Sequence, residues 1–256
     1  MDQTLTRTPP CRAALRRAGR CTQAGMGMIE LLVVMLISLL MLMGLFSIVY
    51  GSRTNYLAQS QMGQLQDNER LAMNVLTNVV QAGGYFPNPT TTTPSGALPA
   101  GTAAGVAWTG GQALAGVVGD QLYVRYAAGV ADGVMDCNGQ TNTSGATMTN
   151  INYFYVNANQ QLVCQVYSNG VAGAIQPLVS GVTAMAVLYG LDTNADSSAD
   201  RYMTAAQVTA ATAWPSVVSV KVTLTFANPL TGATAPGAGT APLPTLTRTI
   251  DLLNKS

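Results

Sequence analysis

The sequence contains no histidine, and this absence narrows the classes of protein that it can represent. Histidine is the commonest general base and zinc ligand, so its absence excludes Ser-His and Cys-His nucleophile pairs and the usual zinc sites. Charged residues make up 9% of the 256-residue chain, against roughly 25% in an ordinary soluble domain. The net charge of +1 also lacks the basic excess of a nucleic-acid-binding protein. We therefore predict a protein that is not an enzyme and has no specific nucleic-acid partner.

The few charges are unevenly placed, because basic residues gather in front of one long apolar segment. Residues 1–25 contain five arginines and a single acid, whereas residues 31–50 contain no charged residue. From Met26 to Tyr50 the only Asp, Glu, Lys or Arg is Glu30. A helix of this length would measure about 37 Å, enough to cross a hydrocarbon layer of about 30 Å. The positive-inside rule keeps the arginines cytoplasmic, so everything after residue 50 would be exported.

Two ordinary explanations for such an N-terminus are a secretory signal peptide and a plain signal anchor. A signal peptide has a shorter apolar segment, of about 7–15 residues, with small residues at a cleavage site after it. Here the small pair Ala24-Gly25 precedes the apolar run. A signal anchor would leave Glu30 unexplained, because a carboxylate in the hydrocarbon costs about 2.5–3.5 kcal/mol and usually has a function.

The segment Gly25-Met-Gly-Met-Ile-Glu30, followed by Leu-Leu-Val-Val, resembles the processing signal of type IV pilins and the related pseudopilins. In that family a membrane prepilin peptidase cuts after the glycine and methylates the new N-terminus. The resemblance implies cleavage between Gly25 and Met26, N-methylation of Met26, and Glu30 as the fifth mature residue. Met26 departs from the family pattern, which usually has phenylalanine at the first mature position.

The resemblance also implies that Glu30 acts in assembly. A carboxylate that is buried where apolar helices bundle needs a partner, and in the family this partner is the positively charged N-terminal amine of a neighbouring subunit. Such a charge-assisted pair fixes the axial register of neighbouring helices and also attracts them to one another.

The helix is expected to continue beyond the membrane segment. Apolar residues recur at helical spacing between Leu57 and Val80, opposite a polar face rich in glutamine and asparagine. The pair Gly83-Gly84 should end it. We therefore expect a cleaved leader at 1–25, a transmembrane or filament-core helix at 26–50, its amphipathic half at 51–84, and a β-rich head at 85–256.

Further blocks along the chain are similar to the PilW family of minor type IV pilins. They are Gly-Ser-Arg at 51–53, Leu-Gln-Asp-Asn-Glu-Arg at 65–70, Ala-Gly-Gly-Tyr at 82–85, Leu-Tyr-Gly-Leu-Asp-Thr-Asn-Ala-Asp at 188–196, Asp-Arg-Tyr at 200–202, and Trp214. The resemblance is strongest over 25–85 and 182–226, whereas residues 90–150 carry no diagnostic pattern.

Short runs rich in β-branched and aromatic residues predict the strands of the head. The clearest lies at 218–226, where valine, leucine and phenylalanine alternate with serine, lysine and threonine. Residues 157–160 would form the turn of a hairpin. The Thr-, Ala-, Gly- and Pro-rich segments 87–119 and 228–244 are expected to be loops. Further strands are expected at 121–126, 151–156, 161–167 and 182–188.

The four cysteines divide between the leader and the head. Cys11 and Cys21 would be removed with the leader, and Cys137 and Cys164 would remain in a head exported to an oxidising periplasm. We expect Cys137 and Cys164 to form a disulfide. The alternatives are two free buried thiols or a metal site, for which two cysteines without histidine are poorly suited.

One acidic loop has the chemistry of a cation site. Asp192, Asn194, Asp196 and Asp200 place oxygen-bearing side chains at alternate positions, as in the first nine positions of an EF-hand loop. The sixth position is Ser197 instead of glycine, and the twelfth position lacks the bidentate glutamate. One prediction is therefore weak calcium binding, and the other is a solvated acidic turn between two strands. We expect no other cofactor.

Together these features predict an α+β, pilin-like fold. A long N-terminal helix, first transmembrane and then amphipathic, would pack on an antiparallel β-sheet head. The resemblance implies a minor type IV pilin that helps to initiate pilus assembly, has a place at the pilus tip, and serves twitching motility and cell adhesion. Two alternatives stay open: a pseudopilin of a type II secretion system, and a single-pass envelope protein with a ligand- or calcium-binding head and no filament.

The same resemblance implies where the chain resides and what it contacts. The chain would be held in the inner membrane, with its N-terminus cytoplasmic and its head periplasmic, and would later reach the pilus fibre at the cell surface. Its implied partners are other minor pilins, the major pilin, the prepilin peptidase, the inner-membrane platform of the pilus machine, and membrane lipid before assembly.

Overall fold

The structure is a computed structural model that describes residues 27–117, 120–229 and 243–254. The chain divides into two compact units, with the boundary between Thr54 and Asn55. The expected leader at 1–25, which contains Cys11, Cys21 and Gly25, lies outside the described residues, and so does Met26. Processing between Gly25 and Met26 therefore stays a prediction from the sequence.

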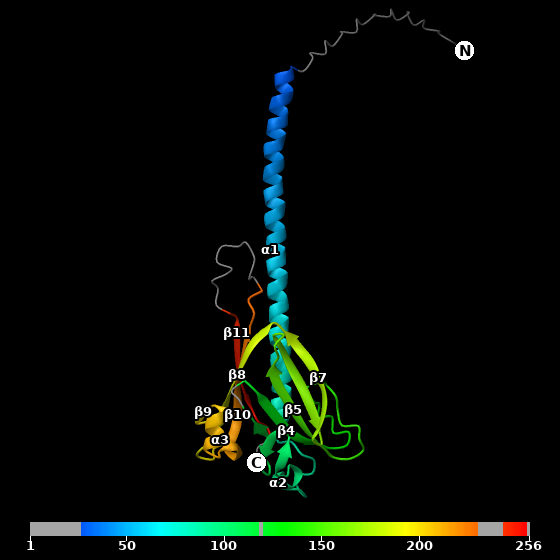
Figure 1. Cartoon of the computed structure of the whole chain (residues 1–256), viewed down its shortest axis with the longest axis vertical. Helices are drawn as coiled ribbons and strands as arrows, with labels where there is room; N and C mark the ends of the chain where they lie inside the picture. The colour runs from blue at the N-terminus through cyan, green and yellow to red at the C-terminus, as the bar shows by residue number, and fades with distance from the viewer. Residues whose placement is uncertain (1–26, 118–119, 230–242, 255–256) are drawn as a thin grey trace, which may run out of the picture. The chain divides into compact units, whose positions relative to one another are not determined.

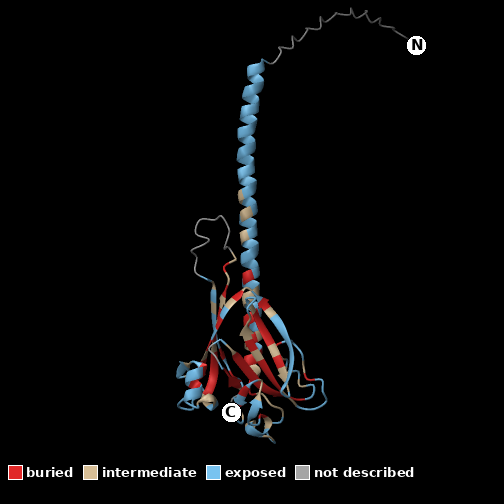
Figure 2. Cartoon of the chain, in the orientation of Figure 1, coloured by how far each residue is buried: buried red, intermediate tan, exposed pale blue. Residues whose placement is uncertain are grey.

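One continuous helix, α1 (Met28–Ala82), contains the apolar segment and its amphipathic continuation (Figure 1). In the first unit, the side chains of this helix are almost all exposed (Figure 2). In the second unit, one face of the helix is buried at a spacing close to the helical repeat, because residues three or four apart share a face. The buried residues of α1 are Leu65, Ala72, Met73, Leu76, Val79 and Val80.

The second unit begins at Asn55 and, among the described residues, all its strand pairs are antiparallel. A five-stranded sheet has the order β3-β4-β5-β6-β7, a four-stranded sheet has the order β11-β10-β8-β9, and β1 pairs with β2 alone. The α+β class with a long N-terminal helix is therefore confirmed. The strands are β1 (Gly101–Ala103), β2 (Val106–Trp108), β3 (Leu114–Ala115), β4 (Leu122–Ala128), β5 (Met148–Val156), β6 (Gln161–Ser168), β7 (Val171–Ser180), β8 (Val182–Leu191), β9 (Arg201–Met203), β10 (Val217–Phe226) and β11 (Thr245–Asp251).

Short helices connect these strands. They are α2 (Pro94–Ala97), α3 (Ala205–Ala210) and the 3-10 helix η1 (Trp214–Ser216). Helix α3 is held by a capping box: the Thr204 side chain accepts from the Gln207 N–H, and the Gln207 side chain accepts from the Thr204 N–H.

Each strand that the sequence predicts is present, with its ends within three residues of the expected ones. The expected hairpin turn at 157–160 is also confirmed, since the Gln160 N–H donates to the Asn157 carbonyl at 3.0 Å. The sequence did not predict β7 or β11. The interpretation of 87–119 as a loop was wrong in part, because this segment contains α2 and three short strands, β1, β2 and β3.

The two larger sheets and the second half of α1 enclose one hydrophobic core. Tyr189 of β8 is fully buried there, and its hydroxyl lies 3.2 Å from the carbonyl oxygens of Ala115 and Gln121. Trp214 packs edge-on against the Tyr189 ring, with the ring centroids 4.9 Å apart. A side chain at Gly190 would collide with Ser219, which explains why glycine follows tyrosine in this block.

The glycine pair ends α1 and brings it against β4. A side chain at Gly83 would come within 2.9 Å of the Val80 carbonyl oxygen and 3.2 Å of a Val124 methyl group. Gly84 has a φ of +78°, and its N–H donates to the Arg125 carbonyl at 2.9 Å. Glycine is therefore required here for both the turn and the close approach.

One buried arginine organises the segment between α2 and β3. The Arg125 guanidinium donates to the carbonyls of Gln112 (2.9 Å), Pro99 (3.0 Å) and Thr109 (2.9 Å). It also lies 4.5 Å from the centre of the Trp108 ring. Burial lowers the pKa of Arg125 to about 10, so the guanidinium is still charged at neutral pH. Because its partners are 13 to 26 residues away, this side chain fastens α2 and the β1–β2 hairpin to the sheet.

Candidate functional site

Glu30 lies in the first turn of α1, and its side chain is exposed. The N–H groups of Glu30 and Leu31 donate to the Gly27 carbonyl at 2.9 and 3.3 Å, so the helix is formed from the first residues that the structure describes. A carboxylate in the first turn also suits the positive end of the helix dipole. The structure thus places Glu30 on the outside of a regular helix, where a neighbouring molecule can reach it.

The first half of α1 carries a continuous apolar surface. Its large side chains are between 49% and 87% exposed from Met28 to Tyr50. The mean hydropathy reaches 2.8 over 18 residues, and none of that window is buried. By length and composition this helix could cross a membrane. Such a surface requires lipid or other apolar helices around it.

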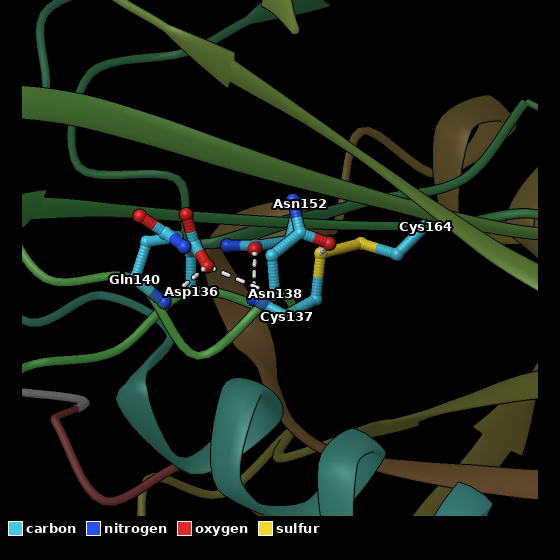
Figure 3. The surroundings of a disulfide bond; sticks show 6 residues. All are labelled: Asp136, Cys137, Asn138, Gln140, Asn152 and Cys164. Carbon is cyan, nitrogen blue, oxygen red and sulfur yellow. Dashed lines mark hydrogen bonds between the residues drawn. A yellow bond between two sulfur atoms is a disulfide. The ribbon is translucent and has the colours of Figure 1, made fainter. Parts of the chain in front are cut away.

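Cys137 and Cys164 form the expected disulfide (Figure 3). Their Cα atoms are 6.4 Å apart, and both residues are buried. The bond ties the loop between β4 and β5 to the core-facing side of β6. Next to it, the Cys137 N–H donates to the Asn152 side-chain oxygen at 2.9 Å. Asp136 holds the turn of the loop, because its Oδ1 accepts from the N–H groups of Asn138 (2.8 Å) and Gln140 (3.0 Å).

Removing this disulfide is expected to destabilise the head. Replacing Cys137 and Cys164 together by alanine should lower the free energy of unfolding by about 3–4 kcal/mol, because the bond closes a loop of 27 residues in the unfolded chain. Denaturant unfolding of the oxidised protein and of the variant measures the difference. Equal unfolding midpoints would contradict this prediction.

The acidic loop between β8 and β9 brings its expected residues together around the backbone. Asp192 accepts from the N–H groups of Asn194, Ala195 and Ser197 at 2.6–3.1 Å. Desolvation is the largest single effect and opposes ionisation of Asp192, but the N–H groups together outweigh it and lower the pKa of its carboxyl group. Ser197 has a φ of +66°, so it adopts the left-handed conformation that glycine usually supplies at this position.

The other two carboxylates of the loop also bind within it. Asp200 accepts from the hydroxyl and N–H of Thr193 at 2.6 and 2.7 Å, and this hydroxyl contact is the largest cause of its lowered pKa. The Asn194 amide reaches both Asp196 (3.1 Å) and Asp200 (3.3 Å). In the part of the chain that the structure describes, no group of three or more His, Cys, Asp or Glu is arranged to hold a metal. Calcium binding by this loop stays a prediction.

A calcium titration of the purified protein decides between the two interpretations of this loop. A cation site predicts heat of binding at or below millimolar calcium, lost in Asp196→Ala and kept in the exposed control Asp251→Ala. Absence of heat at millimolar calcium would leave the loop as an acidic turn held by its own hydrogen bonds.

Comparison with known families gives an independent indication from the head. A family model described as Type IV Pilus-assembly protein W (PilW) matches residues 140–253. The match covers β5 to β11 and includes none of the N-terminal motif around Glu30. A search of curated proteins found no significant match.

The long apolar N-terminal helix and the antiparallel head define a pilin-like protein. Within this class, the match over residues 140–253 makes this part of the chain similar to the PilW family and supports a PilW-family, type IV pilin-like protein. The description of this family points to type IV pilus assembly and, with it, to components of the pilus machinery. The match includes the blocks at 188–196 and 200–202 and Trp214, so it supports the resemblance that the sequence suggested in the head.

Proposed function

We propose that the chain is a minor type IV pilin that helps to initiate pilus assembly and is incorporated in the pilus, at its tip. The observation that carries the proposal is a combination within one chain. A pilin-type processing motif precedes a helix whose apolar side chains are exposed, and a family match covers residues 140–253 of the head. Neither a secretory signal nor an ordinary membrane anchor accounts for both the N-terminal motif and the family match.

The proposed mechanism is non-covalent and begins in the inner membrane. The arginines at 1–25 keep the N-terminus cytoplasmic, so α1 crosses the bilayer and the head enters the periplasm. A prepilin peptidase then cuts after Gly25 and methylates the amine of Met26. Cleavage removes five of the 12 basic residues and creates a new positive charge beside Glu30.

Assembly then exchanges lipid for protein around α1. The apolar surface between Met28 and Tyr50 packs against the same segment of neighbouring pilins, where dispersion contacts replace those with lipid. Glu30 costs about 2.5–3.5 kcal/mol when it is unpaired in hydrocarbon. The amine of a neighbouring N-terminus relieves this cost only at one axial position, so the pair selects the register of the bundle.

In the proposal, the head determines which subunits meet. Other minor pilins and the major pilin are its partners in the fibre, and the inner-membrane platform acts on the assembling subunits. The buried Arg125 and the Cys137–Cys164 disulfide make the head rigid enough to present fixed surfaces to them.

Detection of the chain in sheared pili tests this proposal. A tagged chain should be present in the sheared fraction, and its deletion should abolish or reduce twitching motility while protein secretion continues. Loss of secretion with normal twitching would indicate the pseudopilin of a type II secretion system instead. An uncleaved chain that is absent from any filament would indicate a single-pass envelope protein.

A further inference from the structure

Strand β7 presents a free, uncharged edge. Among the described residues it pairs only with β6, so it ends the five-stranded sheet. Residues 171–177 are exposed, which leaves this part of the strand without cover on either face. The whole stretch between Asp136 and Asp192 contains no Asp, Glu, Lys or Arg. Exposed edge strands commonly carry charges that block pairing with another chain, and β7 has none.

Strand β11 presents the free edge of the other sheet, and it carries two charges, Arg248 within the strand and Asp251 at its end. Among the described residues it pairs only with β10. Arg248 pairs with the buried Val222, and its alternate neighbour Ile250 is buried, so Arg248 lies on the core-facing side of the sheet. Arg248 is nevertheless exposed, since β11 is the last strand. A charge that faces inward at an edge admits only a strand that brings the opposite charge.

A hollow beside the start of β7 contains the charge opposite to that of Arg248, a carboxylate. Its volume is about 370 Å³, and Val171, Ala172 and Gly173 of β7 form one wall. Asn150 and Ser168, from the core-facing side of β5 and β6, line it as well. Asp136 is the one charged residue in this lining. Its Oδ1 accepts from two N–H groups of its own loop, and among the described residues no hydrogen bond reaches its Oδ2.

We propose that β7 of one copy of this protein pairs with β11 of a second copy, with Arg248 entering the hollow beside Asp136. The free part of β7 before Pro177 and the whole of β11 have nearly the same length, about 20 Å. The two edges lie on opposite sides of the head, so they cannot meet within one molecule (Figure 1). Both the inward-facing arginine and the acidic hollow lie on the core-facing sides of their sheets, as a continuous sheet requires.

The charges favour this pairing over either symmetric one. Two β7 edges together would bring Asp136 near its own copy, and two β11 edges would place Arg248 against Arg248. Like charges in such positions disfavour wrong partners, whereas β7 with β11 joins opposite charges. Because the two surfaces differ, the contact is head-to-tail and can repeat along a row of subunits. It adds to the helix contacts proposed above and does not depend on them.

Cross-linking of differently tagged copies tests the contact. Cys11 and Cys21 are first replaced by serine in the full chain. One copy then carries Ile175→Cys on β7 and the other carries Thr247→Cys on β11; both positions are exposed. A short bis-maleimide should link the two copies when they are mixed in detergent, and neither variant should link to itself. A chain with both cysteines should give a ladder of multimers.

A charge exchange tests the specificity. Arg248→Asp in the Thr247→Cys copy, or Asp136→Arg in the Ile175→Cys copy, should lower the cross-linked fraction about tenfold. Mixing the two exchanged copies should restore it. Because Asp136→Arg also removes the two hydrogen bonds that hold the turn, Asp136→Asn is the matched control: it keeps an accepting oxygen, loses the charge, and should lower the cross-linked fraction with the Cys137–Cys164 disulfide intact.

The outcomes decide whether β7 of one copy pairs with β11 of another. The contact is supported if cross-links form only in the mixture and if the double exchange restores them. The contact would be contradicted if Ile175→Cys alone cross-linked as well as the mixture, or if the mixture gave no cross-link. It would also be contradicted if the double exchange failed to restore cross-linking, or if only a different pilin were captured. Such a failure would not alter the Glu30-dependent entry into pili, which is measured separately.

Discussion

Replacing Glu30 by leucine is expected to leave the chain in the membrane and to remove it from the pilus. Insertion should improve, because an unpaired carboxylate in hydrocarbon costs about 2.5–3.5 kcal/mol and leucine costs nothing. Incorporation should fall at least about tenfold, because the neighbouring amine loses the partner that sets the register of the bundle. Immunoblots of the membrane fraction and of sheared pili measure the two quantities in the same cells.

Two further substitutions separate charge from shape in this experiment. Glu30→Gln keeps the size of the side chain and removes its charge, so it should behave like leucine. Ser38→Ala, which removes another polar group of the same helix, should have no effect because that hydroxyl only donates to the Met35 carbonyl. Normal amounts of Glu30→Leu in sheared pili would contradict the proposed role of the carboxylate.

Replacing Arg125 by methionine is expected to destabilise the head by about 1–3 kcal/mol. The side chain is only 4% exposed, and its removal leaves three carbonyls without this donor, of which that of Gln112 is buried. The segment between α2 and β3 should come loose first, since Arg125 is what joins it to β4. Denaturant unfolding measures the stability, and limited proteolysis between residues 94 and 112 reports the local release.

Matched variants make the result specific to the buried site. Arg125→Lys keeps the charge but cannot reach several carbonyls at once, so it should lose part of the stability. Arg201→Met removes an exposed arginine from a short strand and should change the stability by less than about 0.5 kcal/mol. A wild-type unfolding midpoint for Arg125→Met would show that its hydrogen bonds are not needed to hold the segment.

The parts of the fold with a strong periodic pattern could be predicted from the sequence. The run after Glu30 and the buried stripe through Leu76 made α1 evident, and Gly83-Gly84 marked its end. Strand β10 was equally clear, because its alternate residues are buried at one face. In both cases the signal is local: one face of the element meets the core and the other does not.

The elements that the sequence did not reveal lack such a pattern. Strand β7 is exposed on both faces for most of its length and contains Gly173 and Pro177, so it shows neither alternation nor strand propensity. In β11 the alternation is interrupted where Arg248 replaces an apolar residue. Residues 94–115 are ordered by contacts to Arg125 from far along the chain, and no local pattern can express that.

The parts of the candidate site could be predicted to different degrees, because some depend on local sequence and others on contacts that only the structure shows. The Cys137–Cys164 pairing followed once the leader cysteines were set aside, because only two cysteines remained. The role of Glu30 depends on a neighbouring molecule, so the sequence motif indicates it and a single chain only places it on an exposed surface. The hydrogen bonds of the acidic loop required the structure, since Ser197 adopts a backbone conformation that its residue type does not predict.

The N-terminus of the chain recovered from sheared pili shows whether the protein is processed and assembled as a pilin. Mass spectrometry of this material should find a mature chain that begins with N-methylated Met26 and lacks residues 1–25. A chain found only in the membrane fraction and still beginning at Met1 would contradict the assignment of this protein as a processed, filament-forming pilin.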